Sequence, residues 1–339
     1  MFIIIEGADA SGKSTLIEAV EAELRGRYPH RPLVKLHKGR PEQESRRWVI
    51  KDYVLDAEKI DLNKVIVLAD RWHWGEGTYA PLKRPHTDTD GFGLLGAAGW
   101  RWVELFLQSR GAARYWLYQP SRVVRARLNE RGDDYVQADE LSNIIRLYKK
   151  VHRYSGNTVK LQPSPDSLHE VPKLAKWIVD DAEKKAAAVS DIRRFKHYIG
   201  GPRPKVLVLG DERNHNKWYG AATSLPFIPV DGNSGNYLMS ALRDPFWQQA
   251  GIVNINDDPG SFAALWEALG FPPIVVLGRL AEKTLVGLGF EEHEYAVLPH
   301  PQFVKRFFNR RKRDYGKAIA RISRGVGKNK READKWILQ

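Results

Sequence analysis

The chain of 339 residues contains no cysteine. This absence excludes disulfide bonds, thiolate zinc sites and cysteine-ligated iron–sulfur clusters, and it is typical of proteins of the reducing cytosol. Long apolar runs are also lacking, since no stretch approaches the roughly 18 apolar residues that a membrane span needs. The first residues, MFIII, fit a buried strand rather than a secretory signal, because no basic segment precedes them. We therefore expect a cytoplasmic protein with no membrane contact.

Acidic residues are scarce near the C-terminus. Between Phe303 and Arg331 there are twelve Lys or Arg and one acid, Asp314, so this segment carries +11 of the chain's net +13. Such a segment is either a solvated tail or a surface for the phosphate backbone of nucleic acid. Aromatic residues alternate with cations in RFFNRRKRDY, which favours DNA as the partner.

Apolar strands alternate with helical segments in both halves of the chain. The expected strands are FIIIEG, PLVKLH, KVIVLADR, GAARYWLYQP and VKLQP, then KVLVLGDERN, GIVNINDD, PIVVLG and YAVLPH. This alternation predicts an α/β protein with a doubly wound parallel sheet and a second α/β domain. The length also favours two domains. We expect a first domain at 1–182, a linker at 183–204 around the Gly/Pro-rich YIGGPRPK, a second domain at 205–306, and a basic tail at 307–339.

The clearest motif is GADASGKS, residues 7–14, which follows the first strand and precedes a helix. In such a loop the backbone N–H groups and the helix N-terminus surround a phosphate. Gly7 and Gly12 permit close approach, Lys13 bridges the terminal phosphates, and Ser14 holds Mg²⁺. The pattern predicts ATP and Mg²⁺ as cofactors. The expected nucleotide-binding residues are Gly7, Ser11, Gly12, Lys13, Ser14 and Thr15.

A second motif, LADRWHW, ends a strand with Asp70 and Arg71. The carboxyl ends of parallel strands form the ligand-binding edge of open α/β sheets. Asp70 could bind Mg²⁺ or accept a proton from the acceptor, and Arg71 could hold a phosphate with both ends of its guanidinium. The alternative for the pair is a surface salt bridge. Trp72 and Tyr79 either stack on a base or pack in the core.

A third segment, RARLNERGDDYVQADE, places Arg125, Arg127 and Arg131 near a glycine turn. Arginines on a lid over the nucleotide can neutralise the charge that develops on a transferred phosphoryl group. The alternative is a solvated helix face.

Residues 1 to about 180 resemble thymidylate kinases, in FIIIEGADASGKSTLIEAV, in ADRWHWGEGTYAP and in the arginine-rich segment up to Tyr148. The resemblance implies that Asp9 helps to align the reacting phosphates. It also implies a pyrimidine deoxynucleotide as the acceptor. One segment departs from the family, because HKGRPEQES at 37–45 replaces its usual Arg-Glu-Pro-Gly-Gly-Thr. Lys38 and Arg40 retain positive charge there.

Residues 205 to 306 resemble the uracil-DNA glycosylase superfamily in the order of GDERN, LPFIP, GNSGNYLMSAL, NIND, LGRLAEKTL and LPHPQ. The resemblance implies a three-layer α/β domain. It implies that Asp211 or Glu212 lies at the catalytic end, that Phe227 stacks on a flipped base, and that Asn254 reads its edge. His300 would stabilise the departing base anion. The chain lacks the cysteines of the iron–sulfur branch, and GDERN differs from the family's usual first motif.

Three functions follow from these features. The first is ATP-dependent phosphoryl transfer to a thymidylate-like nucleotide, with Lys13, Asp9, Asp70, Arg71, Arg127 and Arg131 as catalytic residues. The second is the same transfer to a 5-hydroxymethylpyrimidine base already in DNA, as in bacteriophage DNA hypermodification, in which case the protein works in the host cytoplasm. The third is a base-excising or base-reading DNA-binding protein. The candidates for the acceptor or base pocket are Lys38, Arg40, Trp72, Tyr79, Asp211, Phe227, Asn254 and His300. The sequence does not indicate an oligomeric state.

Overall fold

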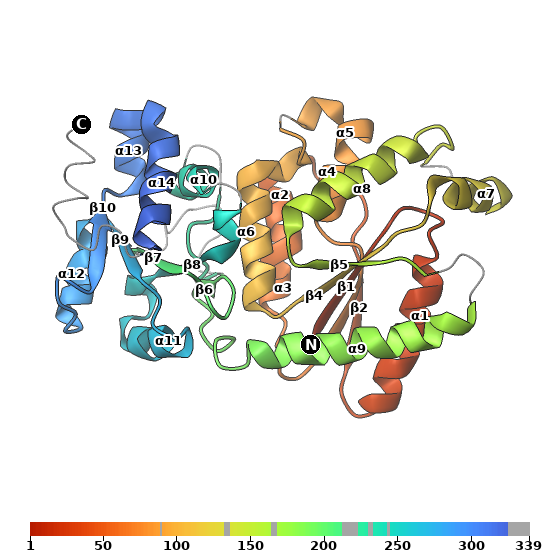
Figure 1. The fold of residues 1–339 in the computed structure, drawn as a ribbon, viewed down its shortest axis with the longest axis horizontal. Helices are drawn as coiled ribbons and strands as arrows, with labels where there is room; N and C mark the ends of the chain where they lie inside the picture. Colours follow the sequence, from red (N-terminus) through yellow and green to blue (C-terminus); the bar gives the residue numbers. More distant parts are fainter. Residues whose placement is uncertain are drawn as a thin grey trace. The chain divides into compact units, whose positions relative to one another are not determined.

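The computed structural model describes residues 1–88, 90–131, 136–163, 168–211, 223–229, 233–242 and 245–324. They form two compact units, Met1–Gly96 with Arg110–Ala188, and Ala97–Ser109 with the described residues from Val189 onward. Each unit contains one five-stranded sheet covered by helices (Figure 1). The predicted α/β class, with a doubly wound parallel sheet and a second α/β sheet, is confirmed.

The first sheet has the strand order β2-β3-β1-β4-β5, and every neighbouring pair is parallel. Its strands are β1 (Phe2–Glu6), β2 (Leu33–His37), β3 (Ile66–Asp70), β4 (Ala113–Leu117) and β5 (Thr158–Leu161). All five residues of β1 and of β4 are buried, as expected for central strands with helices on both faces. Because the strands are parallel, the residues that follow β1, β3 and β4 meet at one edge.

Helices α1 (Lys13–Arg27) and α9 (Val171–Ala188) pack their apolar sides on one face of this sheet. Along the chain between α1 and α9, the other helical elements of this unit are α2 (Arg46–Ile50), the π-helical η1 (Lys51–Leu55), α3 (Asp56–Glu58), α4 (Trp74–Thr78), α5 (Ala80–Lys83), η2 (Pro85–Thr87), η3 (Gly93–Leu95), α7 (Ser121–Arg131), α8 (Leu141–Ser155) and η4 (Leu168–Glu170). Within the described ranges, no helix of either unit combines the length and the apolar character needed to cross a bilayer.

The second sheet has the order β10-β9-β7-β8-β6. Strands β7 (Val206–Gly210), β8 (Ala250–Asn254), β9 (Ile274–Leu277) and β10 (Tyr295–Leu298) are parallel, and β6 (Tyr198–Ile199) pairs antiparallel with β8. Its helical elements are α6 (Gly96–Ser109), α10 (Ser234–Ala241), α11 (Phe262–Ala268), α12 (Arg279–Gly287), α13 (Pro301–Phe308), α14 (Lys312–Ile322) and the short turns η6 (Phe246–Gln249), η7 (Ile255–Asp257), η8 (Pro259–Ser261) and η9 (Asn309–Arg311).

Helix α6 departs from the expected division of the chain. It precedes β4 in sequence, yet all of it but its first residue groups with the second unit. Trp102 Nε1 donates to the carbonyl of Pro226 at 2.8 Å, and Arg101 Nη1 donates to the carbonyl of Met239 at 2.8 Å. The first segment of the chain thus supplies a helix to the core of the second unit.

The basic C-terminal segment is not a free tail over its first part. Helix α14 buries Tyr315 and Ile319, and Tyr315 Oη donates to the carbonyl of Pro299 at 2.7 Å. Gly316 is required there, because a Cβ atom would clash with the Ala241 carbonyl at the end of α10. The expected tail therefore begins, up to residue 324, as an amphipathic helix packed on the second unit. Residues 325–339 lie outside the described ranges.

Candidate phosphate-binding site

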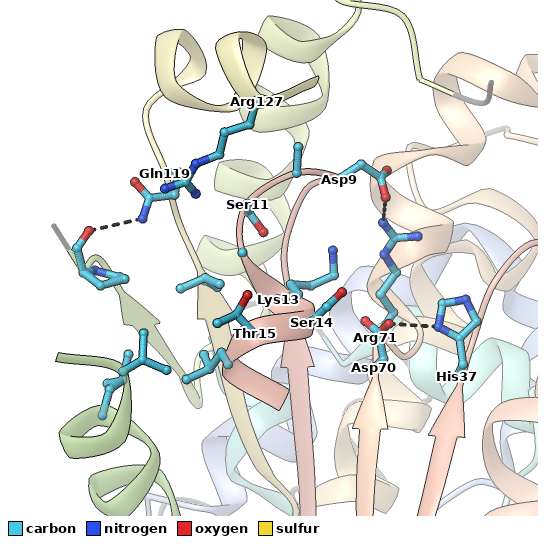
Figure 2. Close-up of a pocket in the computed structure, with 17 residues that line it drawn as sticks. Asp9, Ser11, Lys13, Ser14, Thr15, His37, Asp70, Arg71, Gln119 and Arg127 are labelled. Carbon is cyan, nitrogen blue, oxygen red and sulfur yellow. Dashed lines mark hydrogen bonds and ion pairs between the residues drawn. The ribbon is translucent and has the colours of Figure 1, made fainter. Parts of the chain in front are cut away.

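A cavity of about 460 Å³ lies at the carboxyl edge of the first sheet (Figure 2). It is lined by the loop between β1 and α1, by the ends of β2, β3 and β4, and by residues of α7, α9 and the segment after β5. The lining residues are Asp9, Ala10, Ser11, Gly12, Lys13, Ser14, Thr15, Leu16, His37, Asp70, Arg71, Leu117, Gln119, Arg127, Pro163, Val171 and Leu174. The sequence motifs of the first unit thus converge on one cavity.

The loop needs its glycines for two different reasons. A Cβ atom on Gly7 would lie 2.8 Å from the Leu117 carbonyl oxygen, so a side chain would push β1 from β4. Gly12 has φ +94° and stands at the N-cap of α1, a conformation that L side chains rarely adopt. The Gly7 carbonyl accepts a hydrogen bond from Tyr148 Oη at 2.9 Å, which fixes the loop to α8.

Lys13 is buried inside the loop that precedes it. Its Nζ donates to the Ala8 carbonyl at 3.0 Å, and the side chain is 7% exposed. Burial and, to a smaller extent, the nearby Arg71 guanidinium together lower the pKa of Lys13 to about 8, although the carboxylate of Asp9 opposes the shift. The ammonium is therefore still charged at neutral pH, and a phosphate oxygen can replace its one carbonyl acceptor.

Asp9, Arg71 and Tyr79 form a polar cluster at the cavity wall. Arg71 Nη2 donates to one carboxylate oxygen of Asp9, and Tyr79 Oη donates to the other at 2.9 Å. The guanidinium also lies 5.1 Å from the centre of the Tyr79 ring. Burial opposes ionisation of Asp9, but the charges of Arg71 and Lys13 outweigh it and lower the pKa of the carboxyl group. Arg71 is thereby held at the cavity with φ +65°, an unusual backbone angle for this residue.

Asp70, which directly precedes Arg71, offers a further oxygen ligand at the cavity. Its Oδ2 is 3.0 Å from His37 Nδ1, whereas Oδ1 is buried with no hydrogen-bond partner among the described residues. The Ser14 hydroxyl lines the same cavity. Mg²⁺ prefers a few protein oxygens completed by water and phosphate, so this pair fits the ion. No group of three metal-ligating acids or histidines occurs in the part of the chain that the structure describes.

The expected lid arginines differ in position. A Cβ on Gly12 would lie 3.6 Å from Arg127 Nη1, so α7 brings Arg127 against the loop between β1 and α1. Arg125, two residues earlier on the helix, is exposed and does not line the cavity. Arg131 ends α7, and its side chain lies outside the described residues.

None of the four acceptor candidates of the first unit lines the cavity. Tyr79 is buried and contacts Asp9 and Arg71, which do line it. Trp72 is 1% exposed and packs edge-on against Phe2 with ring centres 5.3 Å apart. Of the two alternatives for this residue, base stacking and core packing, the structure shows core packing. Lys38 Nζ donates to the Asp52 carbonyl at 3.0 Å and pairs with the Asp52 carboxylate. Arg40 Nη2 binds Glu44 at 2.8 Å on the surface.

Three residues at or near the cavity were not predicted from the sequence: Glu6, His37 and Gln119. Glu6 is the last residue of β1, 1% exposed, and its Oε1 accepts from the Trp72 backbone N–H at 2.8 Å. An acid ending an apolar strand just before the loop was the available signal. Gln119 Nε2 donates to the Pro163 carbonyl at 3.2 Å, beside the apolar end of the cavity. Nothing in the sequence marked Gln119 or His37, because their roles depend on which strands are neighbours.

Glu6 should make the stability of the first unit depend on pH. Burial raises its pKa to about 7, above the roughly 4.3 of an unfolded Glu. Folding therefore favours the neutral form of Glu6. The resulting contribution to the free energy of unfolding, about 4 kcal/mol, is full below about pH 4 and is lost as the pH rises through 7. Glu6→Gln keeps an oxygen for the Trp72 N–H and should flatten this part of the profile. Urea unfolding measured by tryptophan fluorescence between pH 5 and 8 tests it. The exposed Glu42→Gln is the control, and an unchanged slope in Glu6→Gln contradicts the expectation.

A second cluster lies at the carboxyl edge of the other sheet. Phe227 and His300 stack with ring centres 6.4 Å apart and planes 28° from parallel. A Cβ on Gly210 would clash with the Phe227 ring and lie 2.7 Å from Asn254 Oδ1. Burial lowers the pKa of His300, and Asp211, which follows Gly210, opposes that shift. The predicted residues Asp211, Phe227, Asn254 and His300 are thus brought together, while Glu212 lies outside the described ranges.

Comparison with known proteins gave three similarities. No protein-family model matches the chain. The SPbeta prophage-derived protein YorR of Bacillus subtilis strain 168 is 26% identical over 162 residues, which are 46% of this chain and 88% of YorR. The crystal structure of YorR in complex with phosphorylated GDP is 22% identical, with a TM-score of 0.42. The match covers 55% of this chain and 98% of the YorR chain. The structure of deoxyadenosine kinase from M. mycoides with bound dCTP is 13% identical, with a TM-score of 0.35. The match covers 53% of this chain and 99% of the kinase chain. Each similarity involves about half of this chain.

Proposed function

We propose that the first unit is an ATP- and Mg²⁺-dependent kinase that phosphorylates a thymidylate-like pyrimidine deoxynucleotide. The observation that carries the proposal is the convergence of Lys13, Asp70, Arg71 and Arg127 on one cavity beside a phosphate-binding loop. Phosphoryl transfer depends mainly on positioning and on charge stabilisation, and this set supplies both.

Each residue has a role that its contacts support. Lys13 exchanges its Ala8 carbonyl for the terminal phosphates of ATP, and Ser14 and Asp70 supply the protein oxygens for Mg²⁺. Bound Mg²⁺ would neutralise charge on the phosphates. Arg127 approaches from the side of Gly12, where charge on the transferred group develops, and Arg131 ends the same helix as a further lid candidate. Asp9 and Tyr79 hold the guanidinium of Arg71 at the cavity, which orients it toward an acceptor.

The apolar end of the cavity suits the base of the nucleotide donor. Leu117, Pro163, Val171 and Leu174 line it, and Gln119 contributes an amide at its margin. Base sites commonly combine apolar walls with a few polar groups of this kind. ATP would then place its base beside α9 and its phosphates in the loop that precedes α1.

A second acceptor is favoured by the second unit. The cluster of Asp211, Phe227, Asn254 and His300 offers a stacking ring with polar neighbours, which is what a base taken out of a duplex requires. With the basic segment from Phe303 onward, it supports a glycosylase-like domain that presents a 5-hydroxymethylpyrimidine in DNA to the kinase. The similarity to a prophage-derived protein agrees with a bacteriophage origin, and ATP and DNA are then met in the host cytoplasm.

One experiment separates these acceptors. Transfer of label from γ-labelled ATP is measured to dTMP, dUMP and 5-hydroxymethyl-dUMP, and in parallel to plain and 5-hydroxymethyluracil-containing DNA. Label on a free monophosphate supports the nucleotide kinase, and label only on modified DNA supports the base kinase. The DNA products are also tested for abasic sites, which would identify base excision as the activity of the second unit. Absence of label on every acceptor contradicts the proposed kinase.

A further inference from the structure

Helix α13, drawn in blue in Figure 1, exposes two aromatic rings to solvent. Phe303 is 46% exposed and Phe307 is 60% exposed, and their ring centres are 4.9 Å apart. The helix already buries Pro301 and Val304 against its own unit, so the two rings are not needed to anchor it. Neighbouring exposed aromatic side chains are an apolar surface that a partner can cover.

The segment that carries the two rings is rich in cations. From Phe303 to Arg324 there are nine Lys or Arg and one acid, Asp314. Arg306 and Arg310 are exposed, and Arg306 lies between the two phenylalanines in sequence. Asp314 lies 4.0 Å from Lys317, away from the aromatic pair in the chain. This concentration of positive charge is complementary to a phosphate backbone.

We propose that Phe303, Arg306 and Phe307 of α13, with Arg310 of the adjoining η9, bind unpaired nucleotides of a DNA strand; these four residues are called the α13 platform. Two bases stack on the rings while the guanidinium groups contact the phosphates between them. A duplex covers the faces of its bases and cannot offer them to a flat exposed ring, so the platform selects single-stranded DNA. This inference deepens the proposed DNA contact of the second unit and rests on it.

The arrangement of side chains favours DNA over a membrane surface. A helix that lies on a bilayer segregates its apolar face from its cationic face. Here Arg306 shares the exposed side of α13 with Phe303 and Phe307, because the opposite side is buried at Pro301 and Val304. Alternating rings and guanidinium groups match the alternation of bases and phosphates along a strand.

Along the chain, the platform closely follows His300 of the cluster at the edge of the second sheet. His300 is the N-cap of α13, where its Nδ1 accepts from the Gln302 backbone N–H at 3.2 Å. The His300 ring stacks on Phe227, and Phe303 follows only three residues later. A strand that crosses the platform therefore brings its next nucleotide toward Phe227 and Asn254.

The test is fluorescence anisotropy with a labelled oligothymidylate and with a duplex of the same length, using the full chain. Phe303→Ala and Phe307→Ala should each weaken binding of the oligothymidylate by about tenfold, with little effect on the duplex. Phe271→Ala, at another exposed ring of the same unit (58% exposed), is the matched control and should change neither. Phe303→Trp keeps an aromatic ring at this position and should bind the oligothymidylate with the affinity of the wild type. Arg306→Ala should weaken both DNAs and reduce the salt dependence of binding.

Three results would overturn the inference. The first is equal affinity for the oligothymidylate and the duplex, with no change in Phe303→Ala or Phe307→Ala. In that case the basic segment would contact phosphates only, and no base would stack on the rings. Binding to anionic phosphatidylserine vesicles in place of DNA would make the helix a membrane contact. Failure to bind any DNA would remove the DNA partner altogether. Transfer of label to free dTMP is measured on the same protein, so that failure of the platform is distinguished from failure of the kinase.

Discussion

Replacing Lys13 with alanine is expected to lower phosphoryl transfer by about a thousandfold or more. The ammonium is buried in the loop with one carbonyl acceptor, at the start of α1, where the phosphates of ATP would bind. Loss of a single preorganised donor to developing charge costs about 10²- to 10³-fold, and loss of a full cation in phosphoryl transfer reaches about 10³- to 10⁵-fold. Initial rates with γ-labelled ATP measure the effect.

The loss should not come from unfolding. Burial lowers the pKa of Lys13, so the folded protein disfavours its charge, and removing the charge does not destabilise the unit. The packing of the buried lysine stem is lost as well, so the melting temperature of Lys13→Ala should stay close to that of the wild type. Lys35→Ala is the control, because Lys35 is an exposed lysine of β2 paired with Glu21 and outside the cavity. Transfer that survives in Lys13→Ala would mean that the loop does not bind the reacting phosphates.

Replacing Arg71 with alanine is expected to lower transfer by about 10²- to 10³-fold, the scale for losing one electrostatic contact to the reacting group. Alanine tolerates φ +65° about as well as arginine, so the change removes the guanidinium without new backbone strain. Arg71→Lys keeps the charge but loses the planar guanidinium, whose Nη2 reaches both Asp9 and Tyr79, and should recover only part of the rate. Steady-state rates at saturating ATP with varied acceptor separate weaker acceptor binding from slower transfer.

Arg27→Ala provides the matched control for Arg71. Arg27 lies at the end of α1 and forms ion pairs with Glu23, Asp180 and Glu183 at the surface of the same unit. Its removal should leave transfer unchanged. If Arg71→Ala also left transfer unchanged, then Arg71 would serve only to neutralise Asp9 in the folded protein.

Several parts of this account could be predicted from the sequence because their signals are local. The loop at residues 7–14 needs only glycine, lysine and serine at fixed spacing between a strand and a helix, and the structure has β1 and α1 there. Asp70 and Arg71 end an apolar strand, and parallel pairing with β1 brings them to the same edge as Lys13. Short apolar strands separated by helices likewise indicated both sheets.

Other parts depend on pairings that no local pattern encodes. Helix α6 is apolar on most of its surface, so its periodicity does not show which sheet it covers, and it groups with the second unit. Strand β6 has only two residues and is defined by its antiparallel partner β8. Trp72 follows Arg71 directly, but the turn after β3 directs its ring into the core, whereas Arg71 remains at the cavity.

The most direct test of the central claim is label transfer from γ-labelled ATP with Mg²⁺, comparing the wild type with Lys13→Ala over the full set of free pyrimidine nucleotides and DNAs. The wild type is expected to label at least one of these acceptors, and Lys13→Ala is expected to label none above background. ATP hydrolysis by the wild type without label on any acceptor would contradict the central claim, because the cavity would then bind and cleave ATP without serving a kinase.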